Sequence, residues 1–221
     1  MKTRNILFAS LSLLILTGCN GNSQSPASSR PDSRENKDSK TSVKSDAGKT
    51  DSTNESNIPS QGKKGMVVYF SATNHTQNVA KAVSDHLSYP LFKLEPVNPY
   101  TSQDLNYSDS SSRVSKEHND PNRHVELKNV TFDGFGSVEY VFLGAPVWWQ
   151  QLSWVIDDFL SQNDFKGKTV IPFGTSASSS FTIDHLKELA PDATWASPKR
   201  FSSSASASSV NEWLDGLDYS F

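Results

Sequence analysis

The chain has 221 residues, with 21 Lys and Arg, 24 Asp and Glu, and a single cysteine. Residues 1–65 hold ten of the basic and six of the acidic residues, a net charge of +4, which leaves −7 for residues 66–221. An acidic folded part argues against nucleic-acid binding, and one cysteine excludes an intramolecular disulfide.

Residues 1–19 have the pattern of a secretion signal that ends in a lipid-modified cysteine. A basic start at Lys2 and Arg4 precedes a mostly apolar run over 6–17, which is shorter than a membrane-spanning helix needs. Leu16-Thr17-Gly18-Cys19 resembles the lipobox of bacterial lipoproteins. The resemblance implies lipidation of Cys19 and an anchor on the extracytoplasmic face of the membrane. The alternative is an ordinary signal peptide with an incidental cysteine.

Residues 20–64 are expected to form a disordered tether. The segment is rich in Ser, Asn, Lys, Asp and Gly, and it contains almost no large apolar residue. Such a segment cannot bury enough surface to offset the loss of chain entropy on folding. Its basic charge can lie along anionic lipid, or it can simply keep a spacer soluble. Residues 65–221 remain as one folded domain, long enough for a single core.

The folded part alternates between strands and helices. Strands are predicted over 66–70, 91–94, 139–144, 169–173 and 193–201. Helices are predicted over 75–87, 112–118, 151–160, 181–189 and 208–217. In the first of these helices, Val79, Val83 and Leu87 recur at intervals of four. The polar stretch 95–129 is irregular apart from its one helix. Five strands that alternate with helices predict a doubly wound, mostly parallel sheet.

The segment 67–80 runs from an apolar strand through a polar turn directly into a helix. This order points backbone N–H groups and a helix N-terminus at one place, which suits a phosphate without any Lys or Arg. The candidate ligands are the turn residues Ser71, Thr73, Asn74, His75, Thr76 and Gln77. The alternative is that Ser71 or Thr73 only caps the helix that follows.

Three segments resemble, in order, the loops that bind flavin in the flavodoxin family. Tyr69-Phe70-Ser71-Ala72-Thr73-Asn74-His75-Thr76 resembles the phosphate loop, Phe142-Leu143-Gly144-Ala145-Pro146-Val147-Trp148-Trp149 the second loop, and residues 165–176 the third. The resemblance covers 66–221. It implies a flavodoxin-like three-layer α/β sandwich, with a five-stranded parallel sheet of order 2-1-3-4-5 and helices on both faces. It also implies FMN as the cofactor.

The resemblance assigns further FMN contacts to the second and third loops: Pro146, Val147, Trp148, Trp149, Thr175, Ser176 and Ala177. Of the two tryptophans, one is expected to pack inward and the other to face the flavin ring, and either can take either place. Backbone amides of 175–177 are expected near the pyrimidine edge of the flavin. Core packing of the tryptophans is the alternative.

Two departures from the family pattern bear on FMN binding. Asn74 stands where the phosphate loop usually has glycine, and Asn tolerates positive φ better than other residues with a side chain. The turn is therefore expected to survive. The third loop, 175–180, lacks the glycines often found there. A degenerate domain that binds flavin weakly or not at all is thus an open alternative.

The sequence predicts neither a metal site nor a catalytic residue. Its five His lie far apart, without a His-Glu-x-x-His motif, and 174–178 lacks the closing glycine of a nucleophile elbow. With Cys19 committed to lipid, a bound cofactor is the expected redox group. The hypothesis is a monomeric, lipid-anchored FMN protein that transfers electrons, with a protein or quinone as donor and acceptor. Alternatives are an FMN-dependent reductase of a quinone or other small molecule, whose cleft 95–129 forms or covers, and a flavin-free binding module.

Overall fold

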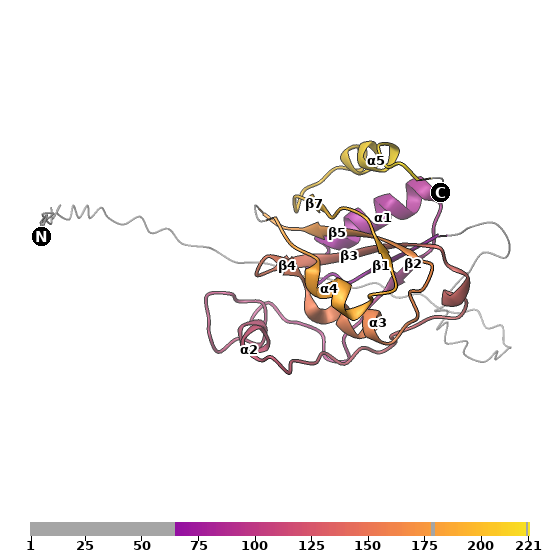
Figure 1. The fold of residues 1–221 in the computed structure, drawn as a ribbon. Coiled ribbons are helices and arrows are strands. Elements are labelled where there is room, and N and C mark those ends of the chain that lie inside the picture. Colours follow the sequence, from indigo (N-terminus) through magenta and orange to yellow (C-terminus); the bar gives the residue numbers. More distant parts are fainter. Residues whose placement is uncertain (1–64, 178–179, 220) are drawn as a thin grey trace, which may run out of the picture. The chain divides into compact units, whose positions relative to one another are not determined.

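The computed structural model describes residues 65–177, 180–219 and 221. The predicted signal peptide, Cys19 and the tether lie outside these residues. Strands and helices alternate along the chain (Figure 1): β1 Gly65–Tyr69, α1 His75–Leu87, β2 Leu91–Lys93, α2 Arg113–Asn119, η1 Phe135–Ser137, β3 Tyr140–Trp148, β4 Gln151–Leu152, η2 Trp154–Ile156, α3 Asp157–Ser161, β5 Thr169–Thr175, α4 Asp184–Leu189, β6 Thr194–Trp195, β7 Lys199–Phe201 and α5 Ala207–Asp215. None of the helices in these ranges is both long enough and apolar enough to cross a membrane.

The strands form one sheet with helices on both faces. The order is β2-β1-β3-β5-β6, with β7 also paired to β5, and all these pairings are parallel. Helices α1 and α5 cover one face, and α3 and α4 cover the other (Figure 1). The predicted α/β class and the order 2-1-3-4-5 are therefore confirmed, with β6 and β7 sharing the fifth position.

The sheet has seven strands instead of the predicted five, and one reason is a break in the last strand. The Ala196 N–H donates to the Val170 carbonyl, and the Ser176 N–H donates to the Phe201 carbonyl. Every second residue along β5 therefore directs its backbone N–H and C=O toward the outer strand. Pro172 falls in the same alternation and has no N–H to give. Pro198 interrupts the outer strand opposite this gap. The predicted strand 193–201 is therefore split into two short pieces.

The second difference is a hairpin where a continuous helix over 151–160 was predicted. Strand β3 runs on to Trp148, and β4 pairs with it antiparallel. The two residues between them, Trp149 and Gln150, have φ of 46° and 62°. Positive φ at both positions is what a two-residue type I′ turn requires. The helical part begins only with η2, so the prediction was wrong for its first three residues and right for the buried face of α3.

The sheet is buried on both faces, and this arrangement fixes its register. Along β1, Val67 and Tyr69 belong to the core under α1 and α5, whereas Met66 and Val68 belong to the opposite core. A strand that is apolar at every position is typical of such a doubly covered parallel sheet. In α1 the predicted buried residue Val83 packs onto the first face.

Candidate functional site

A pocket of about 440 Å³ lies at the carboxyl ends of the parallel strands. Its walls come from the carboxyl ends of β3 and β5 and from the segments after β1, β2, β5 and β7. The lining residues are Ala72, Thr73, His75, Leu105, Tyr107, Pro146, Val147, Trp148, Thr175, Ser176, Ala177 and Ser203. Ligands of open α/β sheets bind at this edge, beside the point where the strand order reverses. The lining contains neither Lys or Arg nor Asp or Glu. It combines hydroxyl groups with apolar surface.

The first loop, between β1 and α1, places the N-terminus of α1 beside the pocket. Asn74 is the N-cap residue with φ of 65°, and its side chain makes no capping hydrogen bond. The expected positive φ of Asn74 is confirmed, and neither Ser71 nor Thr73 occupies the capping position. The first turn of α1 carries no acidic residue that would neutralise the positive end of the helix dipole. Thr73 and His75 line the pocket, so an anion there would meet this end of the helix.

Thr76 lies beneath the turn instead of lining the pocket. Its side chain is buried, and its Oγ1 lies 2.8 Å from Oγ1 of Thr175, which is also buried. This bond ties the first loop to the third across 99 residues of sequence. The Thr76 hydroxyl thus has a partner within the protein, and its predicted contact with a phosphate stays a prediction. The other predicted turn residues, Ser71, Asn74 and Gln77, are likewise not part of the pocket lining.

The second loop separates the two tryptophans. Trp148 is only 2% exposed and packs edge-on against Phe70 and Trp154, with ring centroids 5.8 and 5.0 Å away. It still contributes to the pocket lining beside Pro146 and Val147. Trp149 is 37% exposed and does not line the pocket. The expectation that one tryptophan packs inward is confirmed.

The third loop is held to the outer strand. The Ser176 N–H donates to the Phe201 carbonyl at 3.1 Å, and the Arg200 guanidinium donates to the Ser176 carbonyl at 3.1 Å. The amide of Ser176 is therefore engaged with β7, and its predicted position near a flavin edge stays a prediction. Ser176 and Ala177 still line the pocket, whereas residues 178–179 of this loop lie outside the described ranges.

Four lining residues were not among the predicted contacts: Ala72, which lies inside the predicted phosphate loop, and Leu105, Tyr107 and Ser203. Leu105 and Tyr107 belong to the polar stretch 95–129, where they are two of several scattered apolar residues and no sequence signal sets them apart. Burial raises the pKa of Tyr107 to about 12, against the opposing effect of a hydrogen bond from the Trp148 indole. Tyr107 is therefore protonated at neutral pH and forms a side wall of the pocket.

Glu117 anchors the stretch that carries this side wall. Its carboxylate accepts hydrogen bonds from the Tyr100 hydroxyl at 2.5 Å, the Arg113 Nε at 2.6 Å and the Trp154 indole at 2.8 Å. Arg113 also donates to the Asn98 carbonyl at 2.7 Å. Charge-assisted bonds of this kind are stronger than neutral ones. Both ends of the irregular loop before α2 are thus fixed to the core through one carboxylate.

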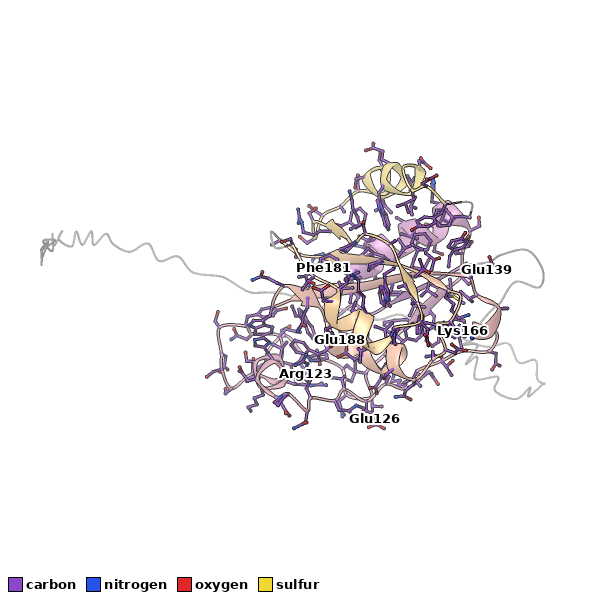
Figure 2. The ribbon with its side chains drawn as sticks, viewed as in Figure 1. Arg123, Glu126, Glu139, Lys166, Phe181 and Glu188 are labelled. Atoms are coloured by element: carbon purple, nitrogen blue, oxygen red, sulfur yellow. The ribbon has the colours of Figure 1, made fainter. Side chains whose placement is uncertain are left out.

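A titrating pair lies apart from the pocket, between α3 and α4. The Nε2 of His185 is 3.0 Å from Oδ1 of Asp157. Burial raises the pKa of Asp157 to about 7, with Arg123 opposing the rise, and burial lowers the pKa of His185. Arg123 and Glu188, both labelled in Figure 2, act on this pair from the segment after α2 and from α4. Neither member lines the pocket, so the pair concerns stability more than ligand chemistry.

The described residues contain no cluster of three or more His, Cys, Asp or Glu placed to hold a metal ion. The pocket offers instead the features that an anionic, partly aromatic ligand needs. Its lining brings together hydroxyl groups, the first turn of a helix, the indole of Trp148 and the ring of Tyr107. FMN fits this arrangement, because its phosphate needs hydrogen-bond donors and its flat ring needs apolar and aromatic surface.

Comparisons with known proteins agree with this geometry. Residues 64–217 match a family described as Flavodoxin. A crystal structure of a protein inferred to be a flavoprotein, from Bacteroides uniformis, is 32% identical and has a TM-score of 0.65, covering 70% of this chain and 99% of its own. A second, from Bacteroides eggerthii, is 33% identical with a TM-score of 0.64, covering 71% and 99%.

A more distant structure shares the fold. The flavoprotein from Lactobacillus acidophilus, solved in complex with FMN, is 20% identical with a TM-score of 0.52, covering 69% of this chain and 99% of its own. Curated proteins give no match to the sequence.

Proposed function

Since this chain belongs to the flavodoxin family, we propose that its pocket binds FMN non-covalently and that the protein transfers electrons through it. The observation that carries the proposal is the pocket at the carboxyl ends of β1, β3 and β5, which joins a helix N-terminus to an apolar wall. The complex of the Lactobacillus acidophilus flavoprotein with FMN supports the choice of cofactor.

Each part of the pocket has a role in this proposal. Thr73, His75 and the first turn of α1 hold the phosphate. Pro146, Val147 and Trp148 contact the flavin ring from one side, and Tyr107 closes the pocket as its side wall. FMN supplies the electron-transfer chemistry when bound, and the protein supplies binding, orientation and the surroundings that set the reduction potential. With a Lys-free lining, the phosphate relies on hydroxyl and backbone donors.

We further propose that Cys19 anchors the protein to the extracytoplasmic face of a bacterial membrane. The support is the lipobox-like Leu16-Thr17-Gly18-Cys19 after a basic and apolar start. Soluble nicotinamide cofactors are scarce outside the cell, so the proposed donor is a membrane protein, a quinol or another surface flavoprotein. A flexible tether over 20–64 would raise the effective concentration of donor and acceptor around a monomeric domain. A Cys19→Ser variant that stays in the membrane fraction would contradict the anchor.

A second candidate function is an FMN-dependent reductase of a small molecule. The observation that favours it is that Leu105 and Tyr107, from the stretch 95–129, line the pocket. The stretch therefore shapes the surroundings of the ligand, which a pure electron carrier does not need. Turnover with a diffusible acceptor would distinguish this candidate from transfer between proteins.

The visible spectrum of the purified protein tests FMN binding. A flavin band near 450 nm, or its appearance after FMN is added, is expected. Thr73→Ala should weaken FMN binding roughly tenfold, because one hydrogen bond to a charged group contributes about 1.5 kcal/mol or more. Thr131→Ala, an exposed threonine outside the pocket lining, is the matched control. A colourless protein that takes up no added FMN would refute the proposal.

A further inference from the structure

Trp148, which lines the pocket, is held by aromatic rings from separate segments of the chain. The Tyr100 ring meets its indole edge-on, with centroids 5.3 Å apart and planes inclined by 68°. The Trp154 ring also meets it edge-on, at 5.0 Å and 63°. Trp148 is only 2% exposed, so its surroundings leave it little freedom to turn. The angle at which its indole faces the pocket therefore depends on where Tyr100 and Trp154 lie.

One carboxylate oxygen binds both of these neighbouring rings. Oε2 of Glu117, in α2, accepts a hydrogen bond from the Tyr100 hydroxyl at 2.5 Å and another from the Trp154 indole at 2.8 Å. The second oxygen, Oε1, accepts from Nε of Arg113 at 2.6 Å. The Arg113 guanidinium also lies 3.9 Å from the centre of the Tyr100 ring. A single side chain outside the pocket lining thus fixes both neighbours of a lining indole.

The two bonds to Oε2 have a fixed direction. Burial, followed by the bond to Glu117, raises the pKa of Tyr100, so its hydroxyl stays protonated at neutral pH and donates. The indole nitrogen of Trp154 is a donor only. Hydrogen bonds weaken steeply when their angles depart from the preferred range. Two donors that share one acceptor oxygen are therefore held at a defined separation and orientation.

Stability alone gives little reason for a carboxylate at this position. The side chains of Glu117 and Arg113 are only 14% and 26% exposed. An ion pair with so little solvent loses hydration on folding, and a well-packed apolar residue in its place is often at least as stable. An apolar side chain could not bring two donors to one oxygen. The arrangement of the rings is thus what the carboxylate adds.

We propose that Glu117 is a positioning residue for the flavin site. Through Tyr100 and Trp154 it sets the orientation at which the Trp148 indole meets the flavin ring. The inference rests on the proposed function for the flavin itself. Contacts between flat rings depend on their angle and distance. A preorganised indole also spares the ligand the cost of ordering that side chain on binding.

Two variants perturb this arrangement without deleting a ring. In Glu117→Gln the amide group faces either Arg113 or the two ring donors, so one set of bonds is lost whichever way it turns. Tyr100→Phe keeps the ring and removes one of the two donors to Oε2. Glu126→Gln is the matched control, because it removes one carboxylate from an exposed position of the same stretch, labelled in Figure 2.

Titration of the purified protein with FMN and with riboflavin measures the effect on the flavin site. Glu117→Gln should raise the dissociation constants of both flavins about three- to tenfold, the cost of ordering one side chain on binding. Both flavins should be affected equally, because they share the ring and differ in the phosphate. Tyr100→Phe should act in the same direction to a smaller extent. Glu126→Gln should leave both constants unchanged.

A Trp148→Phe background tests whether Glu117 acts through Trp148. Trp148→Phe alone should weaken both flavins. Adding Glu117→Gln to it should change their affinity by less than about twofold, because the indole to be positioned is gone. A direct effect of the Glu117 charge on the flavin, or a general loosening of the fold, would persist in this background. Thermal unfolding checks that every variant is folded under the conditions used.

Near-ultraviolet circular dichroism of the flavin-free proteins measures the ring arrangement itself. Glu117→Gln should weaken the indole bands in the native background and leave them unchanged in Trp148→Phe. Unchanged indole bands in Glu117→Gln would overturn the inference, as would an equal loss of flavin affinity with and without Trp148. If the native protein takes up no flavin while Glu117→Gln still alters the indole bands through Trp148, the proposed function fails and the positioning of Trp148 by Glu117 stands.

Discussion

The buried hydroxyl pair of Thr76 and Thr175 is expected to stabilise the fold instead of binding the phosphate. The two Oγ1 atoms are 2.8 Å apart, and the residues are 1% and 5% exposed. Replacing either threonine by valine keeps the shape and leaves the remaining hydroxyl buried without its partner. Such an unpaired group costs about 1–3 kcal/mol. Each of Thr76→Val and Thr175→Val should therefore lower the free energy of unfolding by about that amount.

The double variant distinguishes a direct pair from two independent contributions. With both hydroxyls gone, no unpaired group is left, so the loss should be clearly smaller than the sum of the single losses. The expected coupling is about 1–2 kcal/mol, within the range for residues in contact. Urea unfolding of the native protein, both single variants and the double variant supplies the four free energies needed.

FMN affinity adds a second readout to the same four proteins. If the hydroxyl pair only joins the loops, both single variants should change FMN affinity to the same small extent. Strictly additive stability losses, together with an FMN affinity that falls tenfold in Thr76→Val alone, would refute this reasoning. The original sequence prediction of a phosphate contact from Thr76 would then be right.

Three further predictions concern stability. Lys168→Met should lower the free energy of unfolding in urea by about 3 kcal/mol, because the buried Nζ donates to three carbonyls of the turn 135–138. Lys166→Met, at an exposed neighbouring position, should change it by less than about 0.5 kcal/mol. Equal losses in the two variants would contradict this role of Lys168. The pKa of Asp157 is raised to about 7, so the folded state binds more protons than the unfolded state between about pH 4 and 7, and native stability falls as pH rises through this window. Asp157→Asn should abolish that slope and be more stable above pH 7 by about 1–3 kcal/mol, and unchanged slopes between pH 5 and 8 would disprove it. Gly144→Ala should lower the melting temperature by several degrees, because its Cβ would lie 2.2 Å from the Phe173 ring; a native-like melting curve would show that the ring moves freely.

The parallel sheet followed from local patterns that no tertiary contact overrides, whereas its strand order was implied by the resemblance to the flavodoxin family. The helix over 75–87 was predicted with its observed bounds, because Val79 and Val83 recur at helical spacing and a polar turn precedes it. The sequence predicts the buried strands as short apolar runs between turns. These signals depend only on neighbours in sequence, and the two cores then bury both faces as such runs require.

The misassigned parts depend on partners that are distant in sequence. The turn at Trp149 and Gln150 lacks the Asn-Gly signature of its type, and its φ values become visible only in the structure. Tyr107 reaches the pocket because Glu117 fixes the surrounding loop to Trp154, 37 residues away from that carboxylate. A stretch without periodicity cannot reveal such a contact. The position of Leu105 and Tyr107 was therefore beyond sequence reasoning.

The break between β6 and β7 also bears on how the protein behaves at high concentration. An outer strand with an unbroken row of donors and acceptors can pair with another chain and begin aggregation. Here the outer position holds strands of two and three residues, separated by Pro198, which has no N–H to offer. A second molecule finds no continuous ladder to extend at this edge. The prolines that shorten the fifth strand thus protect the sheet from growing between molecules.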